Sequence, residues 1–253
     1  MKTVSILNLK GGVAKTFTAV NMAYELSRRG YRVLLIDNDK QGNASKAYGR
    51  YDAESIAPTT RLLLGEWTDA SELIQHTEYE NIDIVTANMS LFGAVWNLTK
   101  ADDENQTERY KTLDYAVCDK YDYCIIDNPP DIGVNVINAL AITDEVVVPV
   151  KVDEDALEGL DIVTEQIEDA KAFNPRLKLA GVLITNYQST DGEAAGVEWL
   201  QQQTDFNILG VIRYSRKVAE NSFMRRPIYE YSPCSGAAQG YKKFITEYTG
   251  KAR

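Results

Sequence analysis

The sequence has few of the side chains that build metal centres and disulfide frameworks. His76 is its only histidine, and its three cysteines, Cys118, Cys124 and Cys234, form no C-x-x-C pair. Zinc sites and Ser–His–Asp triads draw on histidine or paired cysteines, so the composition argues against both. An odd, scattered set of cysteines also argues against a disulfide framework or an iron–sulfur cluster. It fits the reduced thiols of a cytoplasmic protein.

Long apolar runs are also lacking. No stretch reaches the roughly 18 consecutive apolar residues that a membrane span needs, and the chain enters a strand-like run too early to hold a signal peptide. Hydrophobic residues make up 44% of the 253 residues and charged residues 25%, which is ordinary for a globular protein. We therefore expect a soluble protein with one large domain and a buried sheet.

The net charge of −10 is unevenly distributed. Residues 210–253 carry nine basic and three acidic side chains, a balance of +6, so the rest of the chain carries −16. A basic segment on an acidic body suits a protein that binds DNA without reading its sequence. A solvated helical surface has the same composition. Before any resemblance is considered, we weigh the two interpretations evenly.

A glycine-rich turn at residues 8–16, Asn-Leu-Lys-Gly-Gly-Val-Ala-Lys-Thr, follows a short apolar run. After it, residues 17–29 have helical periodicity, with Val20, Ala23 and Leu26 on one face. A strand, a glycine-rich turn and a helix together hold a polyphosphate, because backbone N–H groups and the helix N-terminus face the anion. In this arrangement Lys15 reaches the outer phosphates and Thr16 can ligate Mg²⁺.

The turn departs from the standard G-x-x-x-x-G-K-[ST] pattern, since Leu9 and Ala14 stand where that pattern has glycine. It reads instead K-G-G-x-x-K-[ST], and so resembles the deviant Walker A signature of the ParA/MinD family of ATPases. The resemblance implies that Lys10 reaches the nucleotide of a partner subunit, so that bound ATP stabilises a homodimer. A simple turn before an ordinary helix is the disfavoured alternative, and we expect the methyl group of Ala14 to be tolerated. The implied nucleotide-binding residues here are Lys10, Gly11, Gly12, Val13, Ala14, Lys15, Thr16 and Phe17.

Strand-like runs alternate with helical stretches along the whole chain. The runs cover residues 3–8, 32–37, 82–86, 123–127, 145–150, 178–185 and 207–212. Several are unbroken apolar runs, which is typical of strands buried on both faces of a parallel sheet. The pattern predicts an α/β fold with a doubly wound, mostly parallel sheet and helices on both faces, of the P-loop NTPase type. We expect a single ParA-like domain over residues 1–253, with no N-terminal helix-turn-helix.

An acidic segment follows the second of these runs. Residues 37–43 read Asp-Asn-Asp-Lys-Gln-Gly-Asn and resemble the family's D-x-D-P-Q-G-N, with Lys40 in place of proline. The resemblance implies that Asp39 orients the attacking water and that Asp37 supports the Mg²⁺ shell. Phosphoryl transfer needs such positioning more than it needs a strong base. An acidic turn without function is the alternative, and the position one βα unit after Lys15 favours function.

A second aspartate ends the fourth run. Residues 121–130 read Tyr-Asp-Tyr-Cys-Ile-Ile-Asp-Asn-Pro-Pro, close to the family's Y-D-x-[IV]-[IV]-[IV]-D-x-P-P. An aspartate at the end of an apolar strand beside the P-loop strand is the Walker B arrangement that holds the Mg²⁺ shell. The predicted metal residues are therefore Thr16, Asp37 and Asp127, and the predicted catalytic residues are Lys10, Lys15 and Asp39.

Further positions are assigned through the resemblance. Asn186, at the end of a strand, matches an asparagine that hydrogen-bonds adenine, and Arg213 and Tyr214 replace the Pro-Arg that normally flanks the base. Asp153 and Glu154 are candidates for contacts across the dimer interface. An acidic helix start favoured by the helix dipole is an equally good interpretation of Asp153.

The basic segment supplies the DNA-binding candidates Arg216, Lys217, Arg225 and Arg226. Such residues contact phosphates and position the protein without reading bases. The tail offers mainly Phe244, Ile245 and Tyr248 as apolar side chains, too few for stable membrane attachment, so no membrane partner is expected.

The resemblance to the Soj-like ParA group implies a function. ATP and Mg²⁺ bind, the chain dimerises, and the dimer binds non-specific double-stranded DNA on the nucleoid. A ParB-like centromere-binding or adaptor protein then stimulates slow ATP hydrolysis, and the DNA is released. Two alternatives stay open: a positioning or regulatory ATPase that acts through protein contacts alone, and a pseudo-ATPase without turnover, suggested by Ala14 and Lys40.

Overall fold

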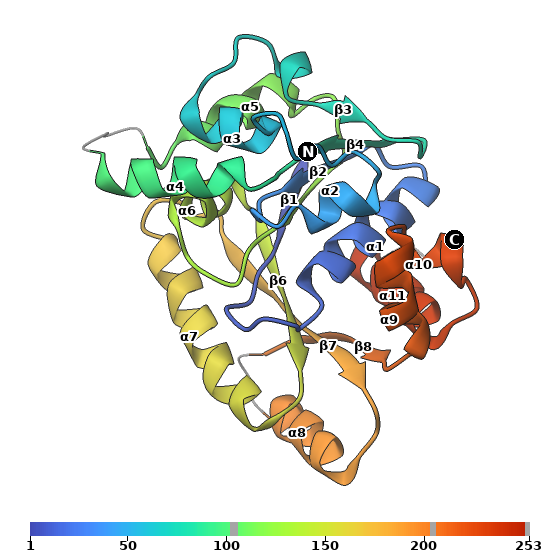
Figure 1. The fold of residues 1–253 in the computed structure, drawn as a ribbon. Helices are drawn as coiled ribbons and strands as arrows, with labels where there is room; N and C mark the ends of the chain where they lie inside the picture. Colours follow the sequence, from blue (N-terminus) through green and yellow to red (C-terminus); the bar gives the residue numbers. More distant parts are fainter. Residues whose placement is uncertain (102–105, 203–205, 251–253) are drawn as a thin grey trace.

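The computed structural model describes residues 1–101, 106–202 and 206–250. Within this part of the chain, eight strands form one sheet in the order β3-β4-β2-β5-β1-β6-β7-β8 (Figure 1). Every neighbouring pair is parallel except β3 and β4. The strands are β1 (Lys2–Ile6), β2 (Val33–Asp37), β3 (Gln75–His76), β4 (Ile82–Val85), β5 (Tyr123–Asp127), β6 (Glu145–Lys151), β7 (Lys178–Tyr187) and β8 (Ile208–Arg213).

The helices between the strands complete the predicted doubly wound α/β fold. They are α1 (Lys15–Arg28), α2 (Asn43–Ala47), α3 (Pro58–Leu64), α4 (Ser90–Lys100), α5 (Arg109–Val117), α6 (Val134–Ile142), α7 (Glu154–Ala170), α8 (Asp191–Gln202), α9 (Arg216–Met224), α10 (Ile228–Tyr231) and α11 (Gly236–Thr249), with a 3₁₀ turn at η1 (Ala70–Glu72). No helix in the described ranges has the length and apolar character that crossing a membrane requires.

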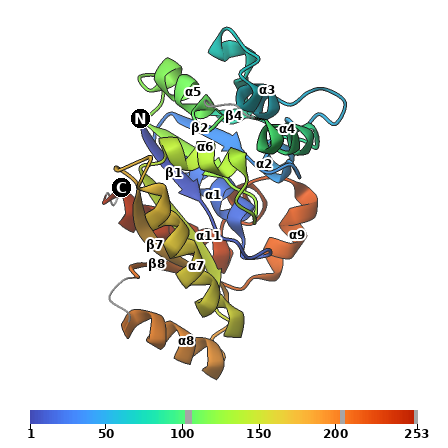
Figure 2. The ribbon, with the colours of Figure 1, turned by 90° about the vertical axis from the view of Figure 1, so that its left-hand side faces the viewer.

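Both faces of the sheet are buried, which explains the unbroken apolar strands. In β2, Leu35 packs into a core with residues of α1 and α11, whereas Leu34 and Ile36 point to the opposite face and pack against α3, α4 and α5. Farther along the same second face, β6 and β7 pack against α7. Figure 1 shows α1 and α11 on one side of the sheet, and Figure 2 shows α6 and α7 on the other.

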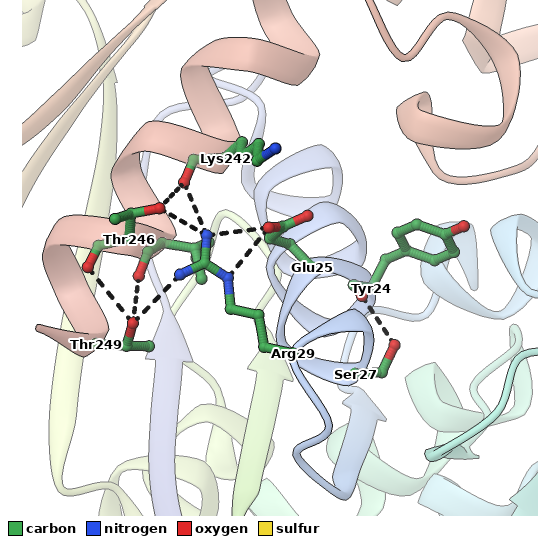
Figure 3. A network of polar contacts seen from close by, with 8 residues as sticks. Tyr24, Glu25, Ser27, Arg29, Lys242, Thr246 and Thr249 are labelled. Atoms are coloured by element: carbon green, nitrogen blue, oxygen red, sulfur yellow. Dashed lines mark hydrogen bonds and ion pairs between the residues drawn. The ribbon is translucent and has the colours of Figure 1, made fainter. Parts of the chain in front are cut away.

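A polar network joins the two helices on the first face (Figure 3). Arg29 follows the end of α1 and forms an ion pair with Glu25, with its Nη2 at 3.0 Å from the carboxylate. The same nitrogen donates to Thr246 Oγ1 at 2.7 Å and to the Lys242 carbonyl at 3.1 Å, both in α11. Because Glu25 and Arg29 are largely buried and satisfied by hydrogen bonds, the network fixes the helix that begins at the glycine-rich turn.

The sequence located all seven predicted strands but missed one. β3 spans two residues and pairs antiparallel at the edge of the sheet, too short to show a pattern. The predicted first helix begins two residues earlier than its periodicity indicated, at Lys15. The last helix begins at Gly236, where the Ser235 hydroxyl caps the Ala238 N–H.

Candidate nucleotide site

The glycine-rich turn lies between β1 and α1, at the carboxyl edge of the sheet, and neighbouring strands hold both of its ends. Asn8 donates from Nδ2 to the Pro149 carbonyl of β6 at 2.8 Å and accepts the Lys10 N–H at 2.8 Å. Thr185 of β7 donates from Oγ1 to the Val13 carbonyl at 3.1 Å. These hydrogen bonds therefore fix the conformation of the turn without the help of a ligand.

Two residues of the turn have left-handed backbone conformations. Gly12 has φ 73°, and Ala14 has φ 67° and ψ 32° where it caps the N-terminus of α1. Glycine adopts this region without strain, whereas the Cβ of alanine makes it unfavourable. This explains why the standard G-x-x-x-x-G-K-[ST] pattern has glycine at the position of Ala14. Ala14 therefore holds a conformation that glycine would adopt more easily, with some loss of stability.

Lys15 extends back over the turn. Its Nζ donates to the Lys10 carbonyl at 2.8 Å, and its side chain is almost fully buried. Burial lowers the pKa of the Lys15 ammonium, and the nearby carboxylates of Asp127 and Asp39 oppose this shift. A cation held in place at this point, among backbone N–H groups, suits a polyphosphate.

Lys10 is paired within the same chain. Its Nζ lies 2.6 Å from Asp153 Oδ1, and about one third of each side chain is exposed. Asp153 occupies the N-cap position of α7 but makes no cap hydrogen bond with its side chain. Asp153 is thus turned toward the glycine-rich turn instead of the helix. The resemblance assigned Lys10 to the partner's nucleotide and Asp153 to the dimer interface, and this fold brings the two together in one chain. The side chain of Glu154, the other interface candidate, lies outside the described part of the structure.

The predicted aspartates end adjacent strands. Asp37 of β2 and Asp127 of β5 are register partners, and both are completely buried. Asp37 accepts hydrogen bonds from the Ser45 N–H at 2.8 Å and the Ser45 hydroxyl at 2.7 Å. Burial nevertheless raises the pKa of Asp37 to about 6. Burial, and then the charge of Asp37, raise the pKa of Asp127 well above its ordinary value.

Asp127 is the unsatisfied member of the pair. Neither of its oxygens has a hydrogen-bond partner of normal geometry among the described residues, although the Thr16 side chain lies near enough to lower its pKa. A buried carboxylate without a partner is costly and needs a cation or a donor. No cluster of three His, Cys, Asp or Glu side chains that could hold a metal occurs in the described ranges. Mg²⁺ fits this site, because it keeps several waters and needs only one or two protein ligands besides phosphate.

The three predicted metal residues therefore differ in position. Thr16 lies beside Asp127, whose two oxygens have no partner of normal geometry among the described residues. The Asp37 carboxylate instead accepts hydrogen bonds from Ser45. Asp39 is 9% exposed, and its Oδ1 accepts the Gln41 N–H at 3.0 Å. Its charge acts on both Lys15 and Asp127, so the predicted catalytic carboxylate belongs to the same cluster.

A buried amide network connects the two loops that follow these strands. Asn38 Nδ2 donates to Asn128 Oδ1 at 2.8 Å, and Asn135 Nδ2 donates to the Asn38 carbonyl at 3.0 Å. The Tyr110 hydroxyl donates a hydrogen bond to Asn38 Oδ1 at 2.8 Å. Sequence reasoning did not assign these residues. The available signal was one asparagine directly after each of the aligned aspartates, Asp37 and Asp127.

The residues assigned to the base lie together at the ends of the last two strands. Arg213 of β8 pairs with Tyr187 of β7, next to Asn186, and the Tyr214 N–H donates to the Tyr187 carbonyl at 2.9 Å. Asn186 has φ 59°, another left-handed conformation, in which a short polar side chain is favoured. Tyr214 is exposed and follows the carboxyl end of β8, so it lies at the same edge of the sheet as the glycine-rich turn, which follows the carboxyl end of β1.

The four predicted DNA contacts are exposed and lie on α9 and just after it, at the right of Figure 1. They are not equivalent. Lys217 Nζ lies 2.7 Å from Glu220, which also accepts the Tyr231 hydroxyl, so part of its charge is neutralised. Arg216, Arg225 and Arg226 pair with no carboxylate of a described residue. The last two basic residues of the sequence lie outside the described ranges.

Comparisons with known proteins agree with this geometry. The profile of the AAA domain family matches residues 1–179. The chain is 34% identical to the sporulation initiation inhibitor protein Soj of Bacillus subtilis, over 97% of each chain. It is 33% identical to the chromosome-partitioning ATPase Soj of Thermus thermophilus, covering 100% of this chain and 97% of the relative.

A solved structure has the same fold. Cobyrinic acid a,c-diamide synthase of Mycobacterium smegmatis, solved with a bound ATP analogue and magnesium, superposes with a TM-score of 0.82 at 26% identity. The match covers 99% of this chain and 97% of that one. The glycine-rich turn with its two lysines, the aligned aspartates and the full-length relatives lead to one conclusion: the chain belongs to the ParA/MinD family.

Proposed function

We propose that this protein is an ATP-dependent partitioning ATPase with ATP and Mg²⁺ as its ligands. The observation that carries the proposal is the buried, unsatisfied Asp127 carboxylate beside Thr16 and Lys15 at a braced P-loop. The relatives include the chromosome-partitioning ATPase Soj of Thermus thermophilus, and a structure with the same fold holds an ATP analogue and magnesium. Both support this assignment.

The residues of the nucleotide site have different roles in phosphoryl transfer. The turn from Lys10 to Thr16 binds the phosphates through backbone N–H groups, and Lys15 exchanges the Lys10 carbonyl for the outer phosphates. Thr16 and Asp127 would hold Mg²⁺, which neutralises charge on the phosphates when bound. Asp39 orients the attacking water, and Asp37 keeps the loop that carries Asp39 in place through Ser45.

The change of state depends on the partner subunit. For Lys10 to reach the nucleotide of a second copy, its ion pair with Asp153 has to open. Closure of two subunits doubles the number of exposed arginines near α9. Non-specific DNA binding depends steeply on the number of phosphates contacted, so the dimer binds where the monomer does not. Stimulated hydrolysis by a ParB-like partner releases the dimer from DNA on the nucleoid.

Phosphate release tests the enzymatic part of the proposal. We expect slow, Mg²⁺-dependent release of phosphate from ATP by the wild type, and none above background from Asp39→Ala, with ATP binding retained. Equal rates for the two proteins would reject turnover at this site and support the pseudo-ATPase alternative.

The second candidate is a positioning or regulatory ATPase that acts through protein contacts alone. The net charge of −10 favours it, since the acidic body repels DNA. Substituting Arg216, Arg225 and Arg226 together with alanine separates the two. Loss of ATP-dependent DNA binding with dimerisation intact supports partitioning, whereas dimerisation without DNA binding in the wild type supports the second candidate.

A further inference from the structure

The end of α9 presents apolar side chains to solvent next to two arginines. Phe223 is 86% exposed, more than any other large apolar side chain in the described part of the chain, and the adjacent Met224 is 43% exposed. Arg225 and Arg226 follow directly, and both are exposed. Single exposed apolar residues are ordinary on a protein surface. A phenyl ring that its own chain leaves almost uncovered, beside two arginines, is available to a partner.

Phe223 and Arg216 lie on the outward face of α9, beside α10 (Figure 1). Val218 and Asn221 define the inward face, since Val218 packs against the core and Asn221 is 3% exposed. At 3.6 residues per turn, positions 216 and 223 fall within about 20° of each other and opposite the inward pair. Their spacing corresponds to about 10 Å of helix. The ring therefore has one arginine two turns before it and two arginines directly after it.

The positive charge around the ring is available to an anion. Glu220 shares the outward face, but its charge is neutralised by Lys217, whose Nζ lies 2.7 Å away. Arg216, Arg225 and Arg226 pair with no carboxylate of a described residue. Guanidiniums without carboxylate partners suit the phosphates of a nucleic acid.

The corner after α9 has a strained conformation. Arg225 caps the helix with φ 50°, in the left-handed region where helices commonly end in glycine. The buried Asn221 holds the next residue, since its Nδ2 donates to the Arg226 carbonyl at 2.7 Å. Backbone strain of this kind is typical of functional positions, and here it points to the Arg225 side chain.

We propose that Phe223 is an apolar contact to DNA, buried in a groove of the duplex while the arginines before and after it bind phosphates. Phosphates cannot cover a phenyl ring, but the sugars and bases that line a groove can, and DNA-binding proteins insert apolar side chains there. The contact reads no base edge, so binding stays independent of sequence. The inference rests on the proposed partitioning function and adds a residue to its DNA-binding surface.

A membrane surface fits this corner less well than DNA. Phe223 and Met224 are two apolar side chains at the end of a nine-residue helix. Membrane-surface helices bury a wide apolar face along their length, so this pair offers too little apolar area for stable attachment.

The salt dependence of DNA binding tests the contact, because an apolar contact and an ion pair change it differently. Fluorescence anisotropy of a labelled duplex gives the affinity of the ATP-bound full chain over a salt series, with every variant brought to the same dimer fraction. We expect Phe223→Ala to weaken binding at least about tenfold, the contribution of an aromatic contact to a base. The slope of log affinity against log salt should stay unchanged. Arg225→Gly should weaken binding and also make that slope shallower by about one per subunit.

Three controls separate a DNA contact from a structural effect. Tyr115 is 78% exposed on α5, which packs on the other face of the sheet from α9, so Tyr115→Ala should bind DNA like the wild type. Phe223→Leu keeps an apolar side chain and should recover most of the lost affinity. Because the ring is exposed, Phe223→Ala should melt at the wild-type temperature.

Each contrary outcome has a distinct meaning. Wild-type affinity in Phe223→Ala, or a shallower slope in that variant, would overturn the inference and leave the partitioning function standing. Absence of ATP-dependent DNA binding by the wild type would reject the inference together with the proposed DNA-binding step. Binding of the wild type to vesicles rich in anionic lipid, lost in Phe223→Ala while DNA binding is retained, would assign Phe223 to a membrane surface instead.

Discussion

Replacing Ala14 with glycine should stabilise the protein, because Ala14 holds φ 67° at the start of α1. An L-residue in this region loses about 1–2 kcal/mol relative to glycine. Glycine in turn loses about 0.4–1 kcal/mol through the greater freedom of the unfolded chain. The difference leaves a gain of about 0.5–1 kcal/mol for Ala14→Gly, and a rise in melting temperature of about 2–4 °C per kcal/mol for a chain of this size.

Urea denaturation of the nucleotide-free protein measures this gain, with two neighbouring glycines as matched controls. Gly12 has φ 73°, so Gly12→Ala should lower the free energy of unfolding by about 1 kcal/mol. Gly11 is outside the left-handed region, and a methyl group added to it would meet no atom of a described residue within 4 Å beyond its chain neighbours. Gly11→Ala should therefore be nearly neutral. A decrease in stability for Ala14→Gly, or equal effects of the two control substitutions, would refute the argument from backbone strain.

Three further outcomes follow from the site. Asp39→Ala should bind ATP with nearly unchanged affinity but release no phosphate above background, as measured by equilibrium binding and phosphate release. Turnover by the variant at the wild-type rate would show that Asp39 has no role in catalysis. Burial raises the pKa of Asp37 to about 6, so between pH 4 and 6 the native state binds more protons than the unfolded state. The nucleotide-free protein should therefore lose stability, on the order of 2 kcal/mol, as pH rises through this window. Asp37→Asn should weaken that dependence in urea denaturation without abolishing it, because burial also raises the pKa of Asp127, and an unchanged profile would contradict the role of Asp37. Asp153→Asn removes one intrachain partner of Lys10 and should raise the dimer fraction at a given ATP concentration by up to about fivefold, the contribution of a partly exposed ion pair. Sedimentation velocity measures that fraction, and a lower dimer fraction would place Asp153 among the contacts between subunits.

The parts of the fold that the sequence predicted are those with a repeated pattern. Strand-like runs, several of them unbroken and apolar, located seven of the strands, and the spacing of glycines and lysines located the P-loop between a strand and a helix. Asp37 and Asp127 each end a strand that the sequence predicted, and these strands pair in register, so the two carboxyl groups lie at one edge of the sheet.

Contacts between side chains distant in sequence could not be predicted in the same way. The ion pair of Lys10 with Asp153 joins residues separated by 143 positions, and neither local sequence requires it. The hydrogen bond between Asn38 and Asn128 depends on the register between β2 and β5, which a single sequence does not reveal. Nor does the composition of the basic segment distinguish Lys217, which is paired with Glu220, from Arg225, which has no carboxylate partner among the described residues.

The central claim is that ATP switches the protein into a form that binds DNA without sequence preference. Fluorescence anisotropy of a labelled duplex of arbitrary sequence, with ATP and with ADP over a series of salt concentrations, tests it most directly. We expect binding with ATP only, with an affinity that falls steeply with salt and is lost in Lys15→Ala and in Lys10→Ala. Equal binding with ADP, or none with ATP while the dimer forms, would contradict it.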